Sequence, residues 1–138
     1  MRITKECIDD QGLIRRSGLH DSSIVEWSYR DSGEFILRLV HPDKISRTVS
    51  CLGVTMLATA NFSLPNGIGY AFAWSPDRTP EGTRTLRDGA WNVLFGVENT
   101  SNEMIQDQLR RRDSAWLFQV LFTTEGCMAL LCDEITID

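Results

Sequence analysis

The first third of the chain carries two short stretches in which apolar and polar residues alternate on either side of a turn. Residues 24–30 and 34–40 flank Asp31-Ser32-Gly33, a three-residue loop whose glycine can adopt the left-handed backbone conformation. We therefore expect an antiparallel hairpin. Its register predicts the pairs Ile24–Val40, Glu26–Arg38 and Arg30–Glu34 on one face, and Val25–Leu39, Trp27–Leu37 and Tyr29–Phe35 on the other. The second face is wholly apolar, so we expect a larger antiparallel sheet to bury it.

Another pair of apolar stretches predicts a second hairpin. Its strands run from Trp116 to Thr123 and from Cys127 to Ile137, around the turn Thr124-Glu125-Gly126. Both faces of these strands are rich in apolar residues, which is typical of strands in the middle of a sheet. The parity of the apolar residues changes near Asp133 and Glu134, where we expect a bulge or a strand end.

Between the hairpins, the run from Ile68 to Trp74 alternates bulky with small residues, which predicts a strand with one bulky and one flat face. Residues 49–54 predict a further strand. The surrounding uncharged stretch from Thr48 to Pro76 is long enough to raise the question of a membrane span. Polar and helix-breaking residues such as Asn61 and Pro65 lie in its middle, where lipid would leave polar groups unpaired. We therefore expect soluble strands and no membrane partner.

One helix is predicted by the capping-box pattern of Thr100 and Glu103. A short apolar stripe follows, formed by Met104, Ile105, Gln108 and Leu109. Arg110-Arg111-Arg112 then complements the negative end of the helix. Together these elements predict a single domain over residues 1–138 of the α+β class, a mainly antiparallel sheet with two hairpins and one principal helix. A β-sandwich and a half-barrel are the alternatives.

The composition narrows the class of partner. The 138 residues are 42% hydrophobic and 24% charged, which is ordinary for a globular protein. The net charge is −5, so the chain lacks the positive excess that attracts nucleic acid, and we expect no nucleic-acid partner. The charged start, Met1-Arg2-Ile3-Thr4-Lys5-Glu6, has no apolar signal region and predicts a cytoplasmic protein.

The cysteines give no sign of a metal or redox site. Cys7, Cys51, Cys127 and Cys132 form no CxxC pair and have no histidine-rich neighbourhood, so we expect buried free thiols. The sequence also contains no GxSxG nucleophile motif and no phosphate-binding loop. We therefore expect no cofactor.

The predicted register of the first hairpin brings chemically reactive residues together at its open end. It places Asp21 across from Asp43 and Ser23 across from His41, with His20 beside them. Imidazole and carboxylate groups can hold a divalent metal or transfer protons, so His20, Asp21, His41 and Asp43 are candidate metal or acid–base residues. The structural alternative is that these segments only begin and end strands, with Asp and Ser side chains bonded to nearby backbone.

The segment from Ser75 to Ala90 is polar and rich in Pro and Gly, and loops of this length are often functional. Tryptophan and arginine contribute most to the energetics of protein interfaces. Trp27 and Trp74 lie on alternating apolar faces and are expected in the core, whereas Trp116 lies at a segment boundary where an indole can be half-exposed. The candidate binding residues are Arg78, Arg84, Arg87 and Trp91.

Several short segments carry a resemblance to known proteins. Leu19-His20-Asp21-Ser22, followed by an aromatic-bearing strand, a glycine-containing turn and a second strand, resembles the start of small bacterial families that include immunity proteins, which neutralise a toxin. Leu52-Gly53-Val54, Asn61-Phe62 and the hairpin from Trp116 to Ile137 are similar to later parts of that pattern. The resemblance implies a mostly β domain that acts by binding, and it brings no catalytic residues.

The first hypothesis for function is a non-catalytic module that binds another protein, with neutralisation of a toxin as its most concrete form. The alternative is a small metal-dependent or acid–base enzyme working at His20, Asp21, His41 and Asp43. A third hypothesis is a structural subunit of a homo-oligomer joined through an exposed edge strand. We expect binding rather than catalysis, because the sequence carries no specific catalytic motif.

Overall fold

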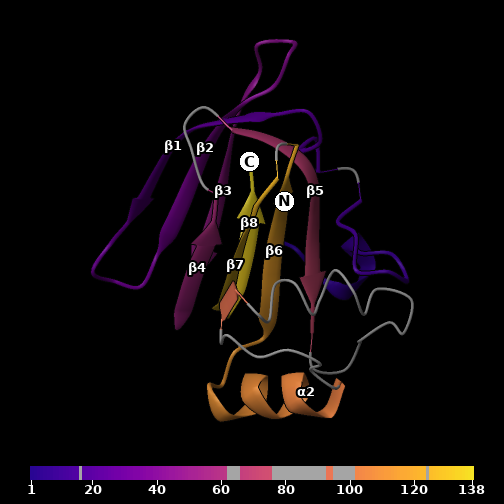
Figure 1. Cartoon of the computed structure of the whole chain (residues 1–138), viewed down its shortest axis with the longest axis vertical. Helices are drawn as coiled ribbons and strands as arrows, with labels where there is room; N and C mark the ends of the chain where they lie inside the picture. Colours follow the sequence, from indigo (N-terminus) through magenta and orange to yellow (C-terminus); the bar gives the residue numbers. More distant parts are fainter. Residues whose placement is uncertain (16, 62–65, 76–92, 95–101, 124) are drawn as a thin grey trace.

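Eight antiparallel strands make up nearly the whole of the fold (Figure 1). The computed structural model describes residues 1–15, 17–61, 66–75, 93–94, 102–123 and 125–138. The strands are β1 (Ser23–Tyr29), β2 (Phe35–Val40), β3 (Ser46–Leu52), β4 (Met56–Ala60), β5 (Asn66–Trp74), β6 (Trp116–Phe122), β7 (Cys127–Cys132) and β8 (Glu134–Ile137). They form one sheet in the order β4-β7-β6-β5-β1-β2-β3-β8.

The predicted α+β class with one principal helix is wrong. Besides the strands, the structure contains the 3-10 turn η1 (Lys5–Cys7) and the short helix α2 (Asn102–Arg111), which lies crosswise at one end of the sheet (Figure 1). No α2 residue among those described belongs to a buried hydrophobic cluster. In the part of the chain that the structure describes, the sheet is therefore not covered by a helical layer, and the fold is nearly all antiparallel sheet. The sandwich alternative required two separate sheets, whereas the strand order runs unbroken through all eight strands.

The sheet covers its own apolar face because it bends back on itself. β3 and β4 follow each other with a break at residues 53–55, and β7 and β8 follow each other with a break at Asp133. β3 pairs with β8, whereas β4 pairs with β7. The Asp133 N–H donates to the Leu52 carbonyl oxygen at 2.9 Å, so the two breaks lie side by side. Gly53 packs against the Asp133 side chain with φ at +64°, a conformation that favours glycine.

Most buried apolar side chains form one cluster inside this bend, and their burial is the main favourable contribution to folding. Both halves of the sheet contribute to it. Its members include Ile24, Leu37, Leu39, Val49, Ile135, Ile68, Phe118, Val120, Met128 and Leu130. A second cluster contains Phe72 and Trp74, whose rings stack 5.3 Å apart at 4° between planes. Trp74 is fully buried, so its expected place in the core is confirmed.

The first hairpin is confirmed near its turn and wrong near its open end. The confirmed pairs are Glu26–Arg38, Trp27–Leu37, Tyr29–Phe35 and Arg30–Glu34. A bulge at Val25 then shifts the register, because a bulge adds one residue to one strand only. Ile24 pairs with Leu39 instead of Val40. As a result Ile24 is fully buried, whereas Val25 is 45% exposed.

The remaining strands follow the sequence pattern with one addition. β6 and β7 form the predicted hairpin and lie inside the sheet, and the break at Asp133 falls where a bulge or strand end was predicted. Their register is shifted by two residues from the one that the predicted turn implies, because Cys127 pairs with Leu121 instead of Thr123. β5 contains the predicted strand from Ile68 to Trp74, and β3 contains most of residues 49–54. β4 is the addition, because the sequence pattern assigned no strand to Met56–Ala60.

The N-terminal segment covers two free edges of the sheet. Residues 2–3 run beside β8, where the Ile3 N–H donates to the Ile135 carbonyl oxygen at 2.8 Å. Residues 12–14 run beside the later part of β5 in the same way. In the described part of the chain, no helix has the length and apolar content needed to cross a membrane.

Candidate binding groove

Trp27 is 47% exposed, so its expected place in the core is wrong. Its cross-strand partner Leu37 is fully buried on the same face. The difference follows the strand neighbours of the two residues. β1 pairs with β5 only at Ser23 and Ile24, so beside Trp27 its sole strand neighbour among the described residues is β2. Leu37 lies between two strands, because it pairs with Trp27 of β1 and with Val49 of β3.

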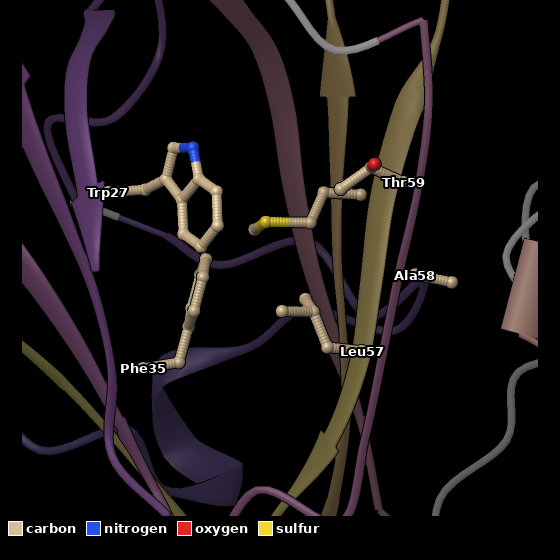
Figure 2. A pocket seen from close by; sticks show the side chains of 6 residues that line it. Trp27, Phe35, Leu57, Ala58 and Thr59 are labelled. Atoms are coloured by element: carbon tan, nitrogen blue, oxygen red, sulfur yellow. The ribbon is translucent and has the colours of Figure 1, made fainter. Parts of the chain in front are cut away.

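A groove separates the end of this hairpin from β4. Its lining residues are Trp27, Phe35, Leu57, Ala58, Thr59 and Met128, and its volume is about 200 Å³. Figure 2 shows Trp27 and Phe35 on one side and Leu57 pointing towards them from β4. The rings of Trp27 and Phe35 lie 6.1 Å apart and are tilted by 33°. We call this hollow the Trp27 groove.

The Trp27 groove continues towards the connection between β3 and β4. A neighbouring hollow shares Leu57 with it and is lined by Tyr29, Val54, Thr55, Met56 and Leu57. Tyr29 is 51% exposed. The Val54 N–H donates to the Gly33 carbonyl oxygen at 2.9 Å, which ties the turn of the hairpin to this connection. The two walls of the groove are thus joined at one end by a main-chain hydrogen bond.

Two strand edges beside the Trp27 groove have no partner strand within the described residues. β4 pairs with β7 on one side and with no strand on the other. β1 pairs with β5 only at Ser23 and Ile24, so the edge from Val25 to Tyr29 has β2 as its sole strand neighbour there. Unpaired N–H and C=O groups along an edge form a template for a further strand.

An acidic pair lies near the end of the groove at this connection. Burial and the neighbouring charge of Asp113 raise the pKa of the Asp133 carboxyl. Thr55 lines the neighbouring hollow, and its hydroxyl forms a hydrogen bond of 3.2 Å with the hydroxyl of Ser114, which follows Asp113 in the sequence. Acidic side chains therefore lie near this hollow, beside the start of β4.

The four predicted metal or acid–base residues form two local pairs. His20 Nδ1 lies 2.9 Å from Asp21 Oδ2, and His41 Nδ1 lies 2.9 Å from Asp43 Oδ1. Across the residues that the structure describes, no group of three or more His, Cys, Asp or Glu side chains could hold a metal ion. The bulge in β1 places Ser23 opposite Val40, so the register that predicted a convergence with His41 is wrong.

The geometry of these pairs is that of strand ends. The Ile45 N–H donates to the Asp43 carboxylate at 2.9 Å, and this bond, together with His41 and Arg47, lowers the pKa of that carboxyl. The His20 ring lies edge-on to the ring of Tyr70, with 5.4 Å between centroids. The bond from Ile45 to Asp43, and the bond that the Ser22 hydroxyl donates to the Gly18 carbonyl oxygen at 3.1 Å, are contacts of the kind that the structural alternative required.

The predicted binding residues Arg78, Arg84, Arg87 and Trp91 lie outside the described residues, and they stay predictions. Ser75, at the start of that polar segment, is buried. Trp116, whose position at a segment boundary left half-exposure open, is 8% exposed and belongs to the main cluster.

The cysteines are free in the structure, and three of them are buried. A hydrogen bond with Cys51 and burial raise the pKa of the Cys132 thiol well above its usual value. Burial also raises the pKa of Cys127. The thiolate is the reactive form of cysteine, so these two side chains act as packing groups rather than nucleophiles.

No protein-family model, no curated protein and no solved structure matches this chain. The resemblance to bacterial immunity proteins therefore stays a prediction. The Trp27 groove is the feature from which function is inferred.

Proposed function

We propose that this protein is a non-catalytic protein-binding module and that the Trp27 groove is its binding surface. The observation that carries the proposal is the exposure of Trp27, which leaves 47% of a large apolar side chain in water at the edge of an apolar groove. Water contact of this kind is unfavourable, and a partner that covers the ring gains the free energy of burying it. Tryptophan is also among the residues most often found at the energetic centre of an interface.

The surroundings of Trp27 favour binding over packing within the chain. Phe35, Leu57 and Met128 supply an apolar lining beneath the exposed ring. Tyr29 adds a second half-exposed aromatic side chain on the same strand face. Two neighbouring aromatic rings beside an apolar hollow match the composition of protein interfaces, which are enriched in Trp and Tyr.

Neutralisation of a toxin is the most concrete form of this proposal, and its support is the resemblance of Leu19-His20-Asp21-Ser22 and the later segments to immunity proteins. The net charge of −5 suits a partner with a basic surface. A basic active site, such as that of an enzyme acting on nucleic acid, is a partner of this kind.

The test is capture of a partner from lysate of the host cell, followed by native mass spectrometry. Three tagged proteins are compared: the natural chain, Trp27→Ser and Tyr70→Ser. Tyr70 is the matched control, because it is an aromatic residue that is 51% exposed on β5 and does not line the groove. Far-UV circular dichroism confirms that both variants fold.

We expect one polypeptide to be retained by the natural chain and by Tyr70→Ser, and to be lost with Trp27→Ser. Removing a central tryptophan from an interface typically weakens binding by about 2 kcal/mol or more, which is roughly thirtyfold. Equal retention by Trp27→Ser would reject the Trp27 groove as the binding surface. A bound divalent ion in place of a polypeptide, lost in His41→Ala, would support the enzyme alternative instead.

A further inference from the structure

The two ends of the strand order differ in how their outer edges are completed. β8 is completed by residues 2–3, which supply both main-chain hydrogen bonds and the buried side chain of Ile3. No described segment completes the outer edge of β4. The fold itself thus shows that an extended segment can close one end of this sheet. The outer edge of β4 offers main-chain N–H and C=O groups of the same kind at the other end.

β4 lacks the usual protection of an edge strand. Its sequence is Met56-Leu57-Ala58-Thr59-Ala60, which contains no charged residue and no proline. Natural sheets commonly protect their edges with lysine, proline, a bulge or a covering segment, because an open edge pairs with other strands. The β4 edge is uncharged, and no described residue covers it, so it is suited to receiving a strand.

The Trp27 groove lies along this edge and offers space for side chains. β4 contributes Leu57, Ala58 and Thr59 to the groove, and Trp27 and Phe35 form the facing side (Figure 2). In a strand added to β4, alternate side chains point to one face of the sheet. Those on the groove face would meet the exposed ring of Trp27, while the main chain bonds to β4.

Acidic side chains lie near both ends of β4. Asp113 and Asp133 lie near its beginning, and Glu125 lies beside the turn that precedes its partner strand β7. Ala60 at the end of β4 pairs with Cys127 of β7, two residues after Glu125. A segment with basic residues at its two ends complements these charges.

From these observations we propose that β4 binds an extended segment of the partner protein as an additional β-strand. The segment is apolar at alternate positions and carries a basic residue at each end. This inference rests on the proposed function, and it adds the class of ligand and the mode of recognition. Main-chain hydrogen bonds to β4 would supply affinity, and the Trp27 groove would select the apolar side chains.

The experiment uses synthetic peptides and isothermal titration calorimetry with the full chain. The parent peptide is Lys-Thr-Leu-Thr-Val-Thr-Leu-Lys with blocked ends. Two isomers carry N-methyl groups, either on the threonines or on the leucines and valine. In an extended strand the N–H groups of alternate residues point to opposite edges, so each isomer blocks a different edge and leaves every side chain in place.

We expect the parent peptide to bind and only one of the two N-methylated isomers to bind about tenfold or more weakly, because that isomer alone loses its hydrogen bonds to β4. Replacing both lysines of the peptide with glutamate should also weaken binding, and the loss should shrink as salt is added. Substitutions in the protein give a second test. Thr59 lies on β4 and lines the groove, so Thr59→Lys should weaken binding of the parent peptide. Ser28→Lys is the matched control, because Ser28 is exposed on the face of β1 opposite to Trp27.

The outcomes separate this inference from the proposed function. If both isomers bind as well as the parent while Trp27→Ser weakens all three, strand addition is rejected and the groove stands as a binding surface. If Trp27→Ser leaves binding of the parent peptide unchanged while one N-methylated isomer still binds weakly, the groove is rejected as the binding surface and an edge interaction at β4 stands.

A second copy of the chain is the competing occupant of the β4 edge. Sedimentation velocity over a range of protein concentrations tests it without any peptide. A dimer that Thr59→Lys abolishes and Ser28→Lys preserves would overturn the inference. Failure of the parent peptide to bind at its highest soluble concentration would overturn it as well.

Discussion

The outer edges of β8 and β4 lie at the two ends of one sheet, and they differ in whether another segment of the chain pairs with them. At β8, the Ile3 N–H bonds to Ile135 and the Ile3 side chain, 3% exposed, enters the main cluster. At β4, the described residues supply neither a strand nor a buried side chain from outside the sheet. Closure of an edge is therefore not decided by the sheet itself but by whether a neighbouring segment brings an apolar side chain with it.

The same comparison explains where function is expected. An edge closed by the chain contributes to stability and has no free hydrogen-bonding groups to offer. An edge left open, beside a groove with an exposed tryptophan, contributes less to stability and keeps those groups available to a partner. The comparison can be tested by substitutions at each edge and at the points that connect them.

The largest loss of stability is expected for a substitution at the closed edge of β8. Ile3→Ala removes a buried side chain from the main cluster and should lower the free energy of unfolding by between about 2 and 5 kcal/mol. Urea denaturation followed by tryptophan fluorescence measures the change. Met104→Ala is the control, because Met104 is 46% exposed on α2 and should change stability by less than about 0.5 kcal/mol. A loss equally small for Ile3→Ala would show that residues 2–3 do not close this edge.

A smaller effect is expected where the hairpin turn meets the connection to β4. Gly33 has φ at +82°, and an added Cβ would meet only the Val54 nitrogen at 3.9 Å, so the cost of Gly33→Ala is backbone strain rather than collision. We expect a loss of roughly 1 to 2 kcal/mol by the same denaturation. Gly69→Ala is the comparison, because an added Cβ there makes an ordinary contact of 3.4 Å with Leu121. Equal losses at the two glycines would contradict the role of the left-handed turn.

A substitution at the open edge of β4 should lower the free energy of unfolding less than one at the closed edge of β8. Leu57→Ala removes a side chain that is partly exposed in the Trp27 groove, so the free energy of unfolding should fall by about 1 kcal/mol. Hydrogen exchange should show the amides of β4 opening more readily than those of β8. A loss as large as that of Ile3→Ala would mean that the open edge is part of the core.

The smallest effect concerns the acidic pair. Since the pKa of Asp133 is raised in the folded protein, the fold favours the protonated carboxyl, and that contribution is present in acid and is lost as pH rises through the raised pKa. Asp133→Asn removes the charge and should raise stability near neutral pH by less than about 1 kcal/mol, because the group is exposed. The gain should vanish below the ordinary pKa of 3.8.

Urea denaturation at several pH values, with Glu125→Gln as a control for loss of one negative charge, measures this dependence. A gain that persists in acid would assign the effect to the amide side chain and not to repulsion from Asp113.

Local patterns predicted the two hairpins because their turns and cross-strand pairs lie close together in sequence. The three-residue loop at Gly33 sets the register of the residues nearest to it, and the charged pair Glu26–Arg38 fits that register alone. The prediction failed beyond Val25 because a bulge depends on how the strand meets its second neighbour, β5. One inserted residue then changed the pairing at the open end, where each histidine contacts the aspartate next to it along the chain.

The binding groove was not predictable for a related reason. Trp27 and Trp74 lie in equally apolar alternating runs, yet Trp27 is 47% exposed and Trp74 is fully buried. The alternation of apolar residues identifies which face of a strand is apolar but not how far another layer extends over it. That extent depends on the neighbouring strands: among the described residues β1 has only β2 beside Trp27, whereas Trp74 of β5 pairs with Leu117 of β6, inside the sheet.

The sequence by itself determined the antiparallel character of the chain, the turn at Gly33 and the break at Asp133, because each depends on residues a few positions apart. The tertiary structure alone decided that the sheet covers its own apolar face, that residues 2–3 close one edge, and that Trp27 faces a groove. The physical reason is that burial is a property of distant segments brought together, and such contacts leave no periodic pattern within either segment.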